Sequence, residues 1–312
     1  MSQSATLSPT MDRPVLGIML MLGFCVLAPM GDALAKILGA VVPLGLLVFV
    51  RFLVQAAILI PIVVTTKRPW RLRGRLFRLM VLRTLLHIAG ITAMFSALQF
   101  LPLADAVAIA FVMPFIMLVL GKYILNEDVG MRRFAACLVG FIGTLLVIQP
   151  SFVQVGWPAL LPVVVAFVFS FFMLVTRQLA KDTDPIGLQA VSGLLASTLM
   201  LPVLLVGNAM DIPALSLSMP DTSTLWMLFA IGVLGTGAHL LMTWSLRFAP
   251  SATLAPMQYL EIPIATAIGW IIFRDLPNTM ASVGICITIG AGVYVILRER
   301  ANARIPTPEA PA

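Results

Sequence analysis

The sequence predicts an all-α integral membrane protein with ten transmembrane helices, arranged as two inverted five-helix repeats with both termini in the cytoplasm. Three observations lead to this fold class. Of the 312 residues, 60% are hydrophobic and 11% are charged, whereas a soluble domain carries about 25% charged residues. The apolar residues form ten stretches long enough to cross a bilayer, and two segments 148 positions apart resemble each other. A soluble fold could not bury this much apolar surface.

A helix needs about 17–25 apolar residues to span a bilayer. Charged and turn-forming residues delimit ten such segments, at 14–38, 43–65, 79–100, 103–125, 133–149, 157–179, 185–206, 222–248, 252–273 and 279–297. The first segment is longer than the apolar region of a signal peptide, and Asp32 directly precedes its Ala33-Leu34-Ala35 sequence, which resembles a cleavage site. We therefore expect this segment to remain as a membrane helix.

Basic residues predict the orientation, because Lys and Arg accumulate in cytoplasmic loops. With the N-terminus inside, sixteen of the 20 Lys and Arg residues lie in cytoplasmic segments, three lie within spans, and Arg274 lies outside. This distribution predicts cytoplasmic termini. The basic run at 67–78 is expected to face anionic lipid, so the lipid bilayer is a predicted partner and nucleic acid is not.

The internal similarity predicts two repeats. ALQFLPLADA at 97–106 matches SLRFAPSATL at 245–254 in four positions, and Pro114 and Pro263 fall mid-helix in the two halves. Each half has five spans, so the second copy must insert upside down. The expected domains are 14–150 and 156–298, flanked by tails at 1–13 and 299–312. Inverted repeats are an architecture of secondary transporters, with the substrate near the midplane.

These features resemble a known family. The arrangement of ten helices in two halves is similar to that of EamA-type members of the drug/metabolite transporter superfamily. So are three segments of the sequence: ALQFLPLADAVAIAFVMPF, the following LNEDVGMRRFAACLVGFIGTLLVI, and their counterpart in the second half, APSATLAPMQYLEIPIATAIGWIIFRD. The likeness extends from about residue 14 to 298. Within that superfamily, three shorter segments resemble bacterial uptake carriers for S-adenosylmethionine and riboflavin. They are GDALAKILG at 31–39, VRF around Arg51 and APMQYLE at 255–261. The resemblance implies transport of a small organic metabolite.

Charged residues within spans are candidates for the site, because a charge at membrane depth is costly unless it faces a polar cavity or a partner. Asp32 and Lys36 lie four residues apart on one helix face, and Arg51 enters the second helix at a similar depth. The three predict either a binding cluster for a charged or polar substrate, or a structural ion-pair cluster that joins the first two helices.

Glu261 is the most informative residue, since it lies near the middle of the ninth span between Pro256 and Pro263. It can bind a cationic group or carry a coupling proton; the alternative is a structural pair with Arg51 or Lys36. Gln258 and Tyr259 stand beside it and can hydrogen-bond a substrate, although Tyr259 and Glu261 do not share a helix face.

The remaining candidates have packing alternatives of their own. Arg83 is expected to extend towards the cytoplasmic surface from the start of the third helix. His87, one turn deeper, is either a titrating group or a packing residue, and the same holds for His239. Trp244, Phe111 and Phe115 either stack on a flat substrate or pack between helices. Small residues for close helix contact are expected at Gly140, Gly143, Gly284, Gly290 and Gly292.

Motifs for nucleotide or metal chemistry were not found: the chain has no phosphate loop, dinucleotide turn or HExxH. We therefore predict no catalytic residues, cofactor or metal. The predicted function is an alternating-access secondary transporter in the bacterial inner membrane, taking up riboflavin or S-adenosylmethionine. The alternatives are an exporter of amino acids, metabolites or drugs, a channel, and an intramembrane enzyme in which Ser96 or Ser170 acts with His87.

Overall fold

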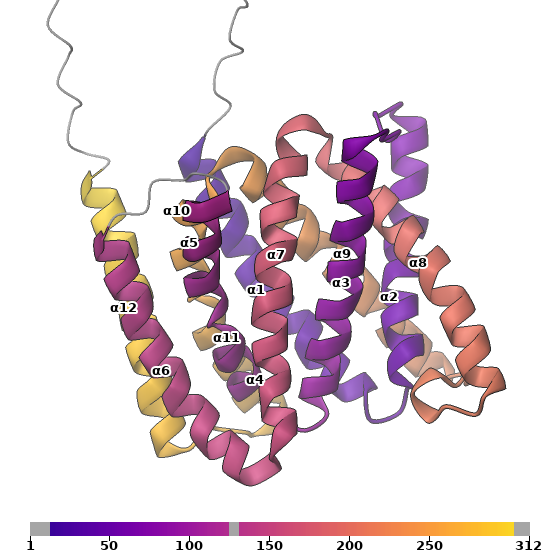
Figure 1. The fold of residues 1–312 in the computed structure, drawn as a ribbon. Helices are drawn as coiled ribbons and strands as arrows, with labels where there is room; N and C mark the ends of the chain where they lie inside the picture. Colours follow the sequence, from indigo (N-terminus) through magenta and orange to yellow (C-terminus); the bar gives the residue numbers. More distant parts are fainter. Residues whose placement is uncertain (1–12, 125–130, 303–312) are drawn as a thin grey trace, which may run out of the picture.

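The computed structural model describes residues 13–124 and 131–302, and this part of the chain is helical without strands (Figure 1). The first repeat contains α1 (Pro14–Leu38), α2 (Leu44–Thr65), α3 (Arg75–Leu98), α4 (Leu103–Ala110), α5 (Met113–Ile124) and α6 (Met131–Val155). The second contains η1 (Trp157–Leu160), α7 (Leu161–Asp182), α8 (Pro185–Ala209), η2 (Pro213–Leu215), α9 (Thr222–Phe248), α10 (Ser251–Gln258), α11 (Glu261–Ile268), η3 (Gly269–Phe273) and α12 (Thr279–Asn302).

Eight helical segments of the described chain are long and apolar enough to cross a membrane, and two shorter apolar helices lie at Glu261–Phe273 and Thr279–Tyr294. The chain is therefore a multi-pass membrane protein. The start of α1 and the end of α12 lie at the same face of the bundle (Figure 1), which we call the terminal face. The predicted tails at 1–13 and 299–312 lie largely outside the described residues.

The fourth and ninth predicted spans are not single helices, which corrects the sequence interpretation. One is broken between α4 and α5, and the other between α10 and α11. Pro114 and Pro263 lack the N–H that would bond to the carbonyl four residues earlier, and a proline is not accommodated in a regular helix interior for this reason. At both breaks a backbone N–H donates to the carbonyl three residues earlier, where a regular α-helix would use the carbonyl four residues earlier. These hydrogen bonds run from Val112 N to Ile109 O (3.4 Å) and from Leu260 N to Met257 O (3.2 Å).

Helix packing follows a pseudo-twofold pattern that relates the two halves. The pair α1–α9 corresponds to α3–α7, and α4–α11 corresponds to α5–α10, while α2 packs on α8 and α6 on α12. In Figure 1, α2 and α8 lie at one edge of the bundle and α6 and α12 at the other. The broken helices lie between these edges, so both repeats contribute to the centre of the molecule.

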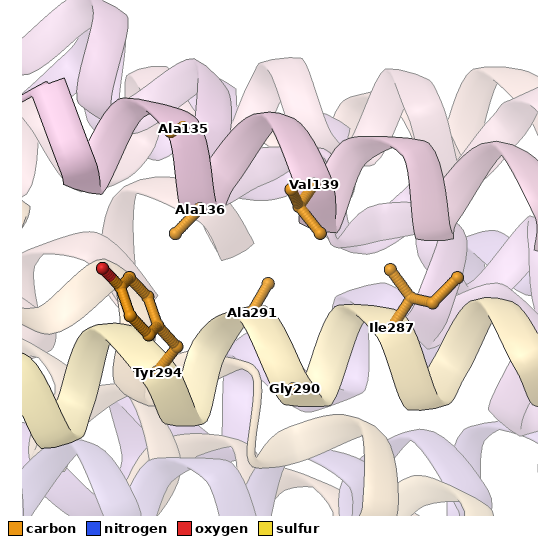
Figure 2. Close-up of a pocket in the computed structure, with 7 residues that line it drawn as sticks. All are labelled: Ala135, Ala136, Val139, Ile287, Gly290, Ala291 and Tyr294. Atoms are coloured by element: carbon orange, nitrogen blue, oxygen red, sulfur yellow. The ribbon is translucent and has the colours of Figure 1, made fainter.

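Close contact between α6 and α12 depends on glycine, as predicted for Gly143 and Gly284. A Cβ atom on Gly284 would lie 2.4 Å from Gly143 O. Thr288 Oγ1 also donates across the pair to Gly140 O at 3.2 Å. Nearer the terminal face the helices leave an apolar groove lined by Ala135, Ala136, Val139, Ile287, Gly290, Ala291 and Tyr294 (Figure 2). The prediction for Gly290 is wrong, since its Cβ would meet no atom within 4 Å.

Candidate functional site

A cavity of about 80 Å³ lies between the two repeats, where the fourth and ninth spans are broken. Three aromatic rings and three polar side chains contribute to its lining: Phe24, Phe111, Phe169, Asp32, His239 and Glu261. Phe111 at one break packs against Tyr259 at the other, with ring centroids 5.5 Å apart. The volume accommodates a few water molecules but is well below the ~300 Å³ at the lower end of ligand pockets. In this conformation the cavity is therefore too small for a ligand of that size.

Asp32 from α1 and Glu261 from α11 face this cavity from opposite repeats. Glu261 is 8% exposed and is the first residue of α11. The ion pairs closer than 4 Å in the described part of the chain are Lys36–Asp275 and Arg68–Asp184. The predicted alternative, in which Glu261 pairs with Arg51 or Lys36, is therefore wrong for this conformation.

Lys36 does not join Asp32 and Arg51 in one cluster. Its ammonium donates to Leu101 O at 2.9 Å and lies 3.4 Å from a carboxylate oxygen of Asp275, and it sits 5.0 Å from the ring centroid of Phe273. These contacts connect α1 to a turn of each repeat at the face opposite the chain ends. Lys36 therefore closes the bundle at that face and does not line the cavity.

Arg51 and His239 lie together at the edge of the cavity. The guanidinium Nη2 of Arg51 lies 3.0 Å from His239 Nδ1. His239 Nδ1 also lies 3.0 Å from Gly235 O, so it accepts from Arg51 in one tautomer and donates to this carbonyl in the other. Gly235 makes the contact possible, since a Cβ there would lie 2.6 Å from Arg51 Nε. Arg51 also interacts electrostatically with Asp32 without a direct contact.

Arg83 does not reach the membrane surface, which corrects the sequence prediction. The helix starts at Arg75, four residues before the predicted boundary, so Arg83 lies eight residues, about 12 Å, along α3. Its side chain is fully buried, donates from Nε to Thr176 Oγ1 at 2.8 Å and lies 4.6 Å from the ring centroid of Phe172. At this depth the guanidinium is enclosed by the bundle.

His87 is also fully buried. Its ring packs against that of His239, at a centroid separation of 4.3 Å, and that of Phe172, at 4.6 Å, and these two rings are themselves 6.0 Å apart. Both His87 ring nitrogens lack a hydrogen-bond partner among the described residues. The two histidines and Phe172 therefore form one cluster of rings that joins the cavity to Arg83.

The other predicted site residues do not line the cavity. Gln258 is buried, with its amide nitrogen 3.1 Å from Met173 Sδ. Tyr259 turns towards α6 and α12, where Gly140 and Gly292 accommodate it, so it points away from Glu261 as expected. Trp244 is half-buried and does not line the cavity, and Phe115 stacks on Phe141 at 5.8 Å.

The sequence profile of the EamA-like transporter family matches residues 15–149 and 156–298, which is most of the chain. The chain belongs to the EamA-like transporter family. Among similar proteins, the riboflavin transporter of Rhizobium johnstonii is 27% identical over 77% of this chain and 74% of its own length. The S-adenosylmethionine uptake transporter of Rickettsia prowazekii is 25% identical over 88% of this chain and 90% of its own.

A solved crystal structure has the same fold, with a TM-score of 0.68 over 92% of this chain and 98% of that one, at 18% identity. The family and the named relatives are transporters rather than enzymes. In this EamA-like chain the hydroxyls proposed for an enzyme donate to backbone carbonyls, from Ser96 to Thr92 O and from Ser170 to Ala166 O. Within residues 13–124 and 131–302, no group of three or more His, Cys, Asp or Glu could hold a metal ion.

Several residues around the EamA-like site were not singled out from the sequence. Phe24 and Ala28 line the cavity at eight and four residues before Asp32, so helical spacing counted from Asp32 could have identified them. Gln189 donates to His239 O and to Thr243 Oγ1, both at 2.8 Å. Gln189 is uncharged and belongs to no recognisable motif, so the sequence does not indicate it. Its hydrogen bonds depend on the packing of α8 against α9.

Proposed function

We propose that this EamA-like protein crosses the bacterial inner membrane ten times, with both termini in the cytoplasm. It takes up a flat, positively charged metabolite by alternating access. S-adenosylmethionine, the molecule in the name of the Rickettsia relative, combines a purine ring with a sulfonium cation. Riboflavin, named for the Rhizobium relative, is flat but uncharged. The aromatic lining of the cavity suits both molecules, and its two carboxylates favour the cation.

The observation that carries this proposal is the position of Asp32 and Glu261 on opposite repeats around one cavity. Two ionised carboxylates in a poorly hydrated space repel each other, so a cation between them is stabilised. Because the carboxylates belong to different halves, the contact with substrate changes when the halves move. A substrate that interacts differently with two conformations shifts the balance between them.

The half-helices supply the moving parts. At the face opposite the chain ends α4 packs on α11, and at the terminal face α5 packs on α10. Opening one of these pairs while the other stays closed exposes the cavity to one side at a time, as alternating access requires. The chain carries no ATP-binding loop, so net accumulation depends on an ion gradient, with a proton on Asp32 or Glu261 as the simplest coupling ion.

Counterflow in proteoliposomes tests the proposal. Vesicles loaded with unlabelled S-adenosylmethionine should transiently accumulate the labelled compound from outside, and the rate should saturate. The variant Glu261→Gln should reduce this exchange. The variant Thr266→Ala should not, because Thr266 lies in the same helix and bonds to Ile262 O away from the cavity.

Parallel assays with riboflavin decide between the two substrates. Saturable exchange of riboflavin but not of S-adenosylmethionine would overturn the cationic substrate class. Flux of either compound without saturation or counterflow would identify a channel and contradict alternating access.

A further inference from the structure

We infer that the transported molecule also carries a carboxylate, and that a basic cluster formed by Arg51, Arg83, His87 and His239 receives it. This inference rests on the proposed function and specifies its substrate as a zwitterion. The carboxylates of Asp32 and Glu261 hold the positive end, and the basic cluster holds the negative end.

The first argument is an excess of unused hydrogen-bond donors. Among the described residues, Arg51 Nη1 and both terminal nitrogens of Arg83 have no partner. His239 Nε2 also has no partner, and it adds a further donor in the tautomer in which Nδ1 accepts from Arg51. Buried donors without acceptors are costly, so this group of side chains is suited to a ligand that supplies acceptor oxygens.

The second argument concerns charge. In the described chain, no carboxylate lies within 4 Å of the Arg51 or Arg83 guanidinium group. Likewise, no basic group lies within 4 Å of the Asp32 or Glu261 carboxylate. A bundle held together by these charges would pair them, because an isolated buried charge is far more costly than a paired one. Two guanidinium groups and two carboxylates instead remain without an ion-pair partner, and a zwitterion could contact both kinds of group.

The third argument is that the basic cluster is continuous with the cavity. His239 lines the cavity, His87 contacts His239 at 4.3 Å, and both His87 and Arg83 lie 4.6 Å from the ring centroid of Phe172. The cluster is assembled from α2, α3 and α9, which belong to both repeats. Separation of the repeats would therefore bring its unused donors into the same aqueous space as Asp32 and Glu261.

A matched pair of ligands tests the inference. Dissociation constants should be measured for S-adenosylmethionine and for its decarboxylated form, which keeps the ring and the sulfonium, with the protein in lipid nanodiscs. For the unmodified protein we expect the loss of the carboxylate to weaken binding about 10- to 100-fold, as for a charged hydrogen bond. Arg83→Met should reduce this ratio towards one. Arg78→Met, which changes an exposed arginine of the same helix, should leave the ratio unchanged.

Thermal unfolding distinguishes this role from a structural one. If Arg83 serves the ligand, Arg83→Met should raise the Tm of the ligand-free protein, because a buried charge without a carboxylate partner is removed. Arg83→Lys keeps the charge without the planar fork and should fold normally while losing most of the preference for the carboxylate. A lower Tm for Arg83→Met together with an unchanged preference in Arg83→Lys would overturn the inference.

The ligand pair also separates this inference from the proposed function. Equal affinity of the unmodified protein for the two forms would overturn the carboxylate site and leave cation transport intact. Binding of neither form would overturn the proposed substrate class and this inference with it.

Discussion

Replacement of Gly284 by alanine tests the contact between α6 and α12. The added Cβ would lie 2.4 Å from Gly143 O and 3.0 Å from Leu146 Cβ, where ordinary contacts are 3.4–4 Å. The obstructing atom is a backbone oxygen, so the two helices must separate by about 1 Å, and overpacking of this kind costs roughly 1–3 kcal/mol. Alanine also gains about 0.8–1 kcal/mol of helix propensity over glycine. The net expectation is a loss of roughly 0–2 kcal/mol.

Gly290→Ala provides the control, because it lies in the same helix and its Cβ would meet no atom within 4 Å. This variant gains the helix propensity without the overpacking, so the difference between the two variants isolates the packing term of about 1–3 kcal/mol. Thermal unfolding of the purified proteins measures it, with Gly290→Ala at or above the Tm of the unmodified protein and Gly284→Ala several degrees below Gly290→Ala. Equal Tm values for the two variants would refute the close approach of α6 and α12.

Three further predictions concern the site and the orientation. Glu261→Gln should weaken binding of a cationic substrate by about 1.5–3 kcal/mol, the magnitude of a charged hydrogen bond; unchanged affinity and an unchanged pH profile of transport would show that the carboxylate only packs. Asp32→Asn should weaken binding in the same assay, whereas Lys36→Met should leave the dissociation constant unchanged and alter the rate of exchange, because Lys36 contacts Asp275 at the closed face and not the cavity. Reporter fusions after Ala303 and within 68–77 should both report the cytoplasm, and a periplasmic signal from either would contradict ten crossings.

The transmembrane helices were predictable because length and hydrophobicity alone define a span. The breaks in the fourth and ninth spans were not predicted, although Pro114 and Pro263 had been recognised as mid-helix residues. A proline can bend a membrane helix or interrupt it, and neighbouring groups decide which occurs. Pro29 illustrates the difference, since it lies inside α1, which continues through it.

The candidate site was predicted in part. Asp32, Glu261 and Phe111 do line one cavity, because a buried charge in an apolar span is rare enough to indicate a site. The depth of Arg83 was misjudged, since the basic and polar first turn of α3 was assigned to the preceding loop. The stacking of His87 on His239 joins residues 152 positions apart in different helices, so nothing in the local sequence indicates it.

The pseudo-twofold relation between the repeats has an energetic consequence. If the two halves were identical, exchanging their conformations would convert the inward-open state into the outward-open state, and the two states would have equal free energy. Any resting preference must therefore arise from positions where the halves differ. Glu261 is such a position, because the first repeat has Val112 and Met113 at the corresponding break. Under the proposed alternating-access cycle, Glu261 would thus contribute both to the binding site and to the side of the membrane that the empty carrier faces.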